Sequence, residues 1–444
     1  MGSDDLHPEA PEVMRRKRIE LVFYLIFFGV CAFTATRRVL KARGPEQYTD
    51  FYYHLGFARD MVETDKNLYL PPKDPALQYP HFLLVPLRLL QLTLPETLIL
   101  ILFGLSLGVG SVMIMKDLQW ILQYLHPLRW LSILLFFVLY FRFFTNNFRE
   151  ANLSLWVGAL SLRGIRLFLQ DKPYKSGALV GLAGAMKLTP LVLTPIFFFH
   201  RGRRAALFAV ALALFLVLVV PLCLMDFDTH LRHLRQFFEA MFGPMLGMDV
   251  PKPEWRWAWH SFSFNGTIDY LFQARSIPFE EQRVMFHVAD LGDRGLAIVK
   301  WVWGSVIFGL AGWGFWRSRK LGRYRALLVQ FSLALLLVAL FAPILRAYHM
   351  IAAILPCALL CSELEFRWKD KLSILWWTTL ILQALAQPLR QKALLGEQVW
   401  EWVDHASVQH FAIVSLLAWI ALGVFRPCRS AAEGALSRSP ASLD

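Results

Sequence analysis

Long apolar runs alternate with short polar, often basic, segments along most of the chain. Eight of these runs approach or reach the length of about 17 to 25 residues that an α-helix needs to cross a bilayer. They cover residues 19–36, 97–115, 152–169, 205–224, 296–316, 326–344, 372–388 and 409–425, and shorter runs cover 130–144 and 347–362. The pattern predicts an all-α, polytopic membrane protein.

Two further apolar stretches do not fit a simple crossing. Residues 81–94 contain Pro86 and Arg88 and are short, so we expect an in-plane or re-entrant helix there. Residues 176–200 have basic clusters on both flanks, which favours a hairpin of two half-helices whose tip is the segment 186–190. With these assignments we expect roughly 12 membrane helices, with both termini on the cytoplasmic side.

Composition and charge support this class. Hydrophobic residues make up 56% of the chain, which includes 36 Phe and 16 Trp, more than a soluble domain of this length carries. The net charge of +13 comes from basic residues in short clusters between the apolar runs. This distribution is typical of the positive-inside rule rather than of nucleic-acid binding. We therefore expect membrane lipid, and no nucleic acid, as a partner.

The basic clusters also orient the chain and divide it into segments. They predict a cytoplasmic tail (1–18), a transmembrane domain (19–425) and a disordered cytoplasmic tail (426–444). Within the domain, 37–96 and 225–295 become external loops, and we expect amphipathic interfacial helices in the first of them. The five cysteines lie mostly in or beside apolar runs, so neither disulfides nor a metal site is expected to organise the fold.

Asp50 is the most informative polar residue, because it follows the first apolar run at the rim of the membrane domain. A carboxylate at a lipid boundary indicates a functional group, and here it is a candidate general base. The alternative is that Asp50 is the N-cap of an amphipathic helix that starts at Phe51, since Asp is a favoured capping residue.

Other ionisable residues are expected on the same face. Lys187 occupies the tip of the predicted hairpin, where its ammonium group either pairs with an anion of the protein or faces a substrate phosphate. Arg346 and His349 are three residues apart, so on a helix they would face the same side and form a small anion site. His349 as a buried core histidine is the alternative.

A set of short motifs in a fixed order carries a resemblance to a known family. The motifs are Asp50-Phe51, Asn67-Leu68-Tyr69, Tyr79-Pro80, the segment 147–152, the segment 181–190, and Tyr348-His349 before Leu355-Pro356. Over residues 20–425 the chain resembles the GT-C superfamily of integral membrane glycosyltransferases. Within it, the chain is most similar to glycosyltransferase family 87, which includes polyprenol-phosphate-mannose-dependent mannosyltransferases.

The resemblance implies an inverting transferase that moves a hexose, mannose in the first instance, from a polyprenyl-phosphate donor to a lipid or glycan acceptor. It implies an active site on the periplasmic face of a bacterial inner membrane, with Asp50 as general base and no cofactor or metal. The donor phosphate would be bound by Lys187, Arg346 and His349. The acceptor or sugar would be bound by Glu150, Asn152, Tyr348, Trp259, His260 and Asn265.

Two motifs depart from the family pattern and leave specificity open. Arg149-Glu150 replaces the usual Gly-Gln, and Asn265-Gly266-Thr267 is the only counterpart of an Asn-Gln-Ser stretch. Glu150 could instead pair with Arg149 or Arg142, and Trp259 could belong to an aromatic belt at the membrane interface.

Three other classes of function stay open at this point. A transporter or lipid flippase should show ionisable residues in several helices and internal repeats, neither of which is clear here. A noncatalytic scaffold with a decayed site would be consistent with Arg149-Glu150. An O-antigen ligase or polymerase would use arginines and a histidine of a large external loop, where the chain has His230, Arg232, His233 and Arg235.

Overall fold

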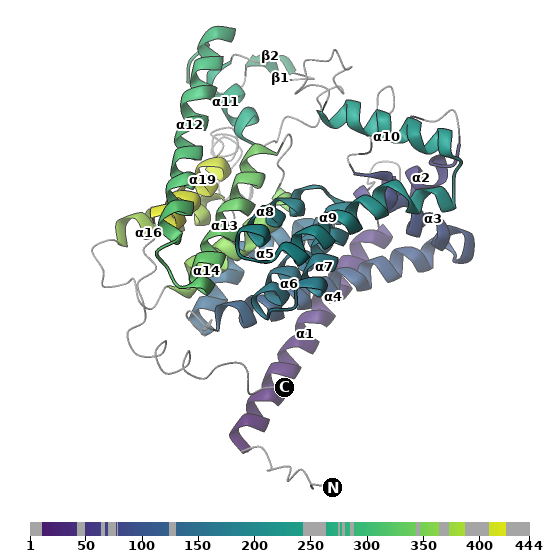
Figure 1. The fold of residues 1–444 in the computed structure, drawn as a ribbon, viewed down its shortest axis with the longest axis horizontal. Helices are drawn as coiled ribbons and strands as arrows, with labels where there is room; N and C mark the ends of the chain where they lie inside the picture. The colour runs from purple at the N-terminus through teal and green to yellow at the C-terminus, as the bar shows by residue number, and fades with distance from the viewer. Residues whose placement is uncertain are drawn as a thin grey trace.

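The computed structural model describes residues 11–41, 49–63, 67–69, 77, 79–123, 130–242, 263–273, 276–277, 280–284, 288–342, 347–363, 373–386 and 408–422. Helices account for nearly all of the regular structure in these residues (Figure 1). The exception is one antiparallel hairpin of two short strands, β1 (Ser276–Ile277) and β2 (Glu280–Val284). The all-α prediction is therefore confirmed at the level of fold class.

Five helices of the described part are long and apolar enough to cross a membrane, or six if a bent helix, α5 (Trp130–Glu150), is counted. They are Arg18–Lys41 within α1 (Pro11–Lys41), α4 (Glu96–Leu122), Arg203–Cys223, α12 (Asp293–Ser318) and α13 (Arg323–Phe341). The span Arg203–Cys223 joins α9 (Arg203–Leu218) to a 3-10 turn, η3 (Val220–Cys223). These helices confirm a membrane protein, whereas the expected total of about 12 crossings stays a prediction.

Shorter helices complete the domain. Several are apolar but have fewer residues than a full crossing requires. These apolar helices include the continuous stretch of the 3-10 helix η6 (Ala347–Ala353) and α14 (Ile354–Ser362), as well as α16 (Ser373–Ala386) and α19 (Val408–Leu422). Helix α6 (Ser154–Leu169) is a further short helix of the domain.

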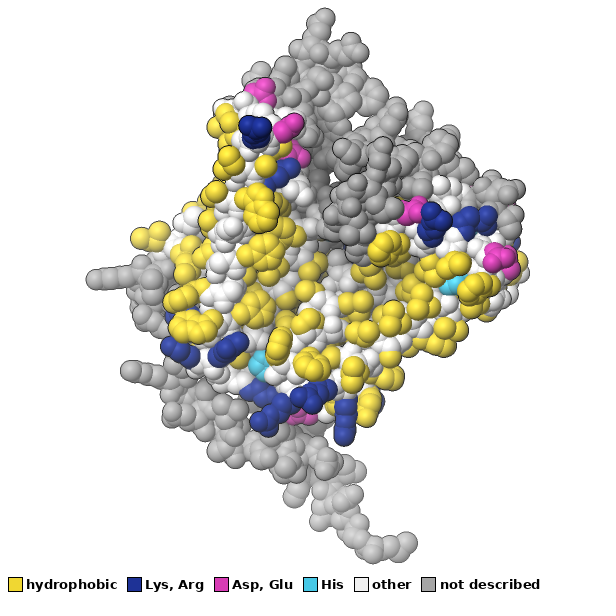
Figure 2. All heavy atoms as spheres, turned by 45° about the horizontal axis from the view of Figure 1, so that its top comes forward, with side chains coloured by type: hydrophobic (Ala, Val, Ile, Leu, Met, Phe, Trp, Pro, Cys, Tyr) yellow, Lys and Arg dark blue, Asp and Glu magenta, His cyan; other side chains and the backbone are white. Residues whose placement is uncertain are grey.

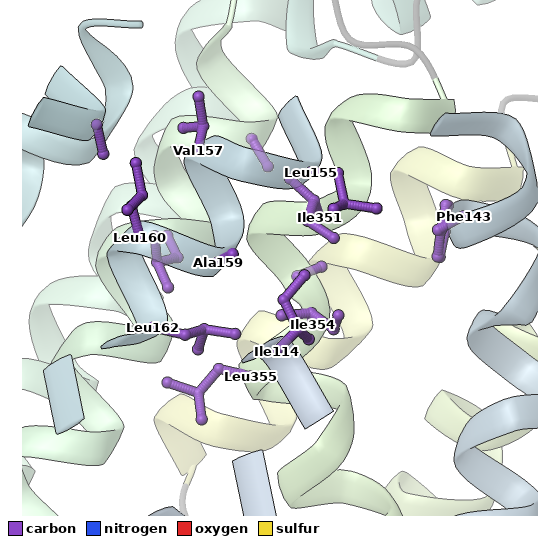
Figure 3. Packing of buried hydrophobic residues seen from close by; sticks show 14 of the residues in the cluster. Ile114, Phe143, Leu155, Val157, Ala159, Leu160, Leu162, Ile351, Ile354 and Leu355 are labelled. Carbon is purple, nitrogen blue, oxygen red and sulfur yellow. The ribbon is translucent and has the colours of Figure 1, made fainter. Parts of the chain in front are cut away.

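The centre of the domain is a close-packed apolar core where α4, α5, α6, η6 and α14 meet (Figure 3). Small residues allow the closest approaches between these helices. A Cβ atom on Gly158 of α6 would lie 2.5 Å from Cγ1 of Ile351, and one on Gly110 of α4 would lie 2.6 Å from Cδ2 of Leu155. The helices that carry the candidate site are thus fixed against one another by packing.

The predicted hairpin is present. Helix α7 (Pro173–Met186) ends at Lys187, whose backbone is extended, and the chain continues through a 3-10 turn, η2 (Thr189–Val192), into α8 (Leu193–Phe199). The end of α8 lies beside the end of α6, because the ring of Phe197 stacks on that of Phe168 with 4.4 Å between ring centroids. The chain therefore returns to the end of the molecule at which α7 begins. Lys187 is therefore at the tip, as expected from the sequence.

The basic clusters on either side of this hairpin lie at one end of the molecule. Arg323 at the start of α13 forms an ion pair with Asp171 at 3.1 Å, and His200 and Arg201 line a pocket beside them. Figure 2 shows Lys and Arg side chains along the lower edge of the apolar band. Helices α6 and α7 both reach this basic end, at the end of α6 and the start of α7. The start of α6 and the hairpin tip at Lys187 therefore lie at the other end of the molecule, away from the basic clusters.

Helices of the two predicted external loops cover the molecule at that opposite end. They are α2 (Asp50–Asp60), η1 (His81–Leu83), α3 (Leu84–Thr93), α10 (Phe227–Phe242) and α11 (Phe264–Phe272). Helix α2 packs on α4, since the rings of Phe51 and Phe103 stack with centroids 3.6 Å apart. It is also tied to α3 by Gln91, whose Nε2 donates to the carbonyl of Leu55 at 2.9 Å.

Candidate active site

Asn152 contacts the candidate base directly. Its Nδ2 donates a hydrogen bond to Oδ2 of Asp50 at 2.5 Å, and the side chain is fully buried. The other end of the amide is also engaged, because Oδ1 accepts from the backbone N–H of Ser154 at 2.7 Å. The amide orientation is thus set by the chain, and its N–H₂ group points at the carboxylate.

The turn between α5 and α6 creates this position. Helix α5 ends at Glu150, Ala151 adopts a positive φ of 48°, and the N–H of Asn152 donates to the carbonyl of Asn147 at 2.9 Å. Helix α6 then begins at Ser154. Asn152 is thereby held between the two helices rather than on either of them.

Asp50 is the first residue of α2, and Thr49 occupies the N-cap position. The capping alternative is therefore not what the structure shows, and the carboxylate instead binds Asn152.

Tyr79 connects the remaining groups of the site. Its hydroxyl oxygen accepts from Nδ2 of Asn152 at 3.5 Å, and Nζ of Lys187 lies 5.6 Å from its ring centroid. The ring of His54 meets it edge to face, with centroids 5.1 Å apart. Tyr79 is itself buried. One aromatic ring thus touches side chains from α2, from the α5–α6 turn and from the hairpin tip.

Lys187 is the cation of this site. Burial lowers its pKa to about 8, and the nearby charge of Asp50 acts in the opposite direction. The ammonium group is therefore mostly protonated at neutral pH, and it lies close enough to Asp50 for the two charges to interact. A carboxylate that can accept a proton and a cation that can pair with a phosphate are brought into one site.

A group of four side chains, here called the histidine clamp, supports Tyr79 and α2. Its members are Tyr69, His81, His230 and His233. His81 Nε2 lies 2.8 Å from His230 Nδ1, and the hydroxyl of Tyr69 lies 3.2 Å from both His81 Nδ1 and the carbonyl oxygen of Tyr79. The clamp therefore joins the backbone beside the site to α10.

Two further bonds extend the clamp and define its role. Nε2 of His230 donates to the carbonyl of Leu218 at 2.8 Å, and Nε2 of His233 donates to the carbonyl of Met61, just after α2, at 3.1 Å. In the part of the chain that the structure describes, no three His, Cys, Asp or Glu side chains converge as metal ligands. The loop histidines that the ligase hypothesis would use thus hold helices together.

The remaining predicted site residues have different positions. Glu150 lies 3.5 Å from Arg149, which is the ion pair expected as the alternative to acceptor binding. His349 lies in η6, which packs against α5 and α6, the helices that flank Asn152. Asn265 is exposed on α11, and Figure 1 places α11 at the opposite side of the molecule from α2. Arg346, Trp259, His260 and the side chain of Tyr348 lie outside the described residues.

Sequence reasoning gave no role to Tyr79 or His54. The only signal for His54 was its position four residues after Asp50, which places both on one face of α2. Tyr79 appeared only as part of a short motif, and its central position depends on contacts between distant segments.

Comparison with known proteins gives one match. The sequence model for glycosyltransferase family 87 matches residues 78–343. No curated protein and no solved structure matches the chain. The matched region includes Tyr79, Asn152 and Lys187, while Asp50 and His54 precede it and His349 follows it.

Proposed function

The chain belongs to glycosyltransferase family 87 and is a membrane glycosyltransferase, and we propose that it moves a hexose from a polyprenyl-phosphate donor to a hydroxyl group of a lipid or glycan acceptor. In this proposal Asp50 is the general base. The site is on the external face, away from the basic end of the molecule, and mannose is the first hexose to test.

The observation that carries the proposal is the buried contact of Asp50 with Asn152 beside Lys187. Asp50 takes the proton of the acceptor hydroxyl while its oxygen attacks the anomeric carbon. The bond from that carbon to the phosphate oxygen breaks, and the polyprenyl phosphate leaves with the electron pair. Attack on the face opposite to the phosphate inverts the anomeric configuration.

The other groups of the site support this reaction. Asn152 fixes the direction of the carboxylate, which keeps the base aligned with the hydroxyl that it deprotonates. Lys187 stabilises the negative charge that collects on the departing phosphate. We assign His349 to the same phosphate side, since η6 packs against the helices that flank Asn152. Arg346 is assigned to that side from its sequence spacing to His349 alone.

A donor panel tests the proposal. Purified protein in host membrane lipids would be given radiolabelled polyprenyl-phosphate-mannose, other polyprenyl-phospho-hexoses, and nucleotide sugars as matched controls. We expect transfer from at least one polyprenyl-phospho-hexose and none from the nucleotide sugars. Transfer from nucleotide sugars alone, or from no donor, would overturn the proposed donor class.

A further inference from the structure

His54 is a buried histidine whose two ring nitrogens have no hydrogen-bond partner among the described residues. Its side chain is only 4% exposed, and neither Nδ1 nor Nε2 reaches a donor or acceptor. Burying a polar group without a hydrogen bond destabilises the folded state, because the group loses its hydrogen bonds to water and gains none in return. Such a group therefore calls for an explanation.

The three histidines of the clamp are different. His81, His230 and His233 are also buried, yet each uses its ring nitrogens in hydrogen bonds to other side chains or to backbone carbonyls. The ring of His54 packs edge to face on the ring of Tyr79. A phenylalanine would provide that contact equally well, so packing alone does not account for an imidazole.

The position of His54 relates it to the active site. It follows Asp50 by four residues on α2, which places the two side chains on one face with Cβ atoms about 5–6 Å apart. It also touches Tyr79, whose ring contacts Lys187 and whose hydroxyl contacts Asn152. Burial lowers the pKa of His54 to about 4, so the ring is neutral and offers one N–H donor and one acceptor nitrogen.

We propose that His54 is an acceptor-positioning residue, whose ring hydrogen-bonds a second hydroxyl of the acceptor next to the one that Asp50 deprotonates. This inference rests on the proposed function, because it needs an acceptor hydroxyl at Asp50. The spacing of the carboxylate and the imidazole on α2 suits two neighbouring hydroxyl groups of one ring. The substrate thereby supplies the hydrogen bond that the fold itself does not.

Kinetics with a ring-preserving substitution test this role. His54→Phe keeps the packing on Tyr79 and removes both nitrogens, while His54→Asn and His54→Gln retain an N–H donor and an acceptor. Initial rates would be measured with radiolabelled polyprenyl-phosphate-mannose as donor and host membrane lipid extract as acceptor. His200→Phe is the matched control, because His200 lies at the basic end and binds Gln330.

We expect the apparent KM for the acceptor extract to rise about tenfold in His54→Phe, the value for one lost hydrogen bond. The KM for the donor should equal that of the wild type within measurement error, and the unfolding temperature should stay equal or rise. At least one of the two amide variants should recover part of the loss.

Each other outcome has a definite meaning. An acceptor KM within twofold of wild type in His54→Phe overturns the role of His54 while leaving the transferase intact. A lower unfolding temperature with equal losses for donor and acceptor shows a structural role instead, and the amide variants then repeat that loss. A wild-type protein that transfers sugar from no donor overturns the proposed function itself, and with it this inference.

Discussion

Nδ2 of Asn152 lies 2.5 Å from Oδ2 of Asp50, although the two residues are 102 positions apart in the chain. Since Oδ1 of Asn152 is held by the N–H of Ser154, the amide cannot turn away without losing that bond. The carboxylate of the proposed base is thus aligned by a turn between two core helices.

Removing this alignment should lower the rate. We expect Asn152→Ala to reduce kcat by about 10- to 100-fold, because a base whose direction is not fixed loses part of the benefit of orientation. Thr93→Ala is a suitable control, since its exposed hydroxyl bonds only to carbonyls of its own helix. A kcat within twofold of wild type, with folded protein confirmed by its unfolding temperature, would show that Asn152 does not orient Asp50.

The alkaline limb of the pH profile should report Lys187. Its pKa is lowered to about 8 by burial, so the ammonium form is present below that pH and is lost as the pH rises through it. We expect kcat/KM for the donor to fall above about pH 8. Lys187→Arg keeps the charge at high pH and should remove this fall. An alkaline limb at the same pH in both proteins would assign it to another group.

The histidine clamp should make the fold sensitive to acid. Burial, with the neighbouring histidines, lowers the pKa of His81 to about 3, whereas the unfolded chain has a histidine pKa of about 6.5. The folded state therefore binds fewer protons than the unfolded state between these values, and stability falls as the pH drops below about 6.5.

For His81 alone this loss is about 2 kcal/mol at pH 5. The unfolding temperature measured from pH 7 to pH 5 checks the direction. The pKa values of His54, His230 and His233 are also lowered, so these histidines contribute with His81 to the fall of the unfolding temperature with decreasing pH. The His81→Phe variant should be less stable than the wild type at pH 7, but its unfolding temperature should fall less between pH 7 and pH 5. An equal fall in the two proteins would contradict the role of His81 in the acid sensitivity.

Close packing of α6 on η6 should not tolerate an added methyl group. A Cβ at Gly158 would meet Ile351 at 2.5 Å, so we expect Gly158→Ala to destabilise the protein by about 1–3 kcal/mol. Gly309→Ala is the matched control, because nothing lies within 4 Å of its Cβ position in α12. Unfolding temperatures in the same detergent compare the two, and equal values would show that the contact relaxes without loss.

The sequence predicted those parts of the fold that depend on local patterns. The length of the apolar runs predicted the long membrane helices, and the basic clusters on both flanks predicted the hairpin with its tip at Lys187. The total of about 12 crossings has no such support, since only five or six described helices meet the length requirement.

The site was harder to predict, because its contacts join distant segments. Asp50, Asn152 and Lys187 could each be chosen by residue type and position, but the bond between Asp50 and Asn152 could not. His54 was missed because burial without a partner is a property of the tertiary structure. Asn265 was expected to line the site from its motif alone, and its helix lies away from α2.

The central claim is that Asp50 is the base, and Asp50→Asn tests it most directly. An asparagine keeps the size of the side chain and can still accept from Asn152, but it cannot take a proton. Transfer from radiolabelled polyprenyl-phosphate-mannose to membrane lipids would be compared with wild type and with Asp60→Asn, a control at the other end of α2. We predict that Asp50→Asn loses at least about a hundredfold in rate at equal folding, within the 10²–10⁴-fold range of general-base catalysis, while Asp60→Asn retains activity. Equal transfer by Asp50→Asn and wild type would contradict the account.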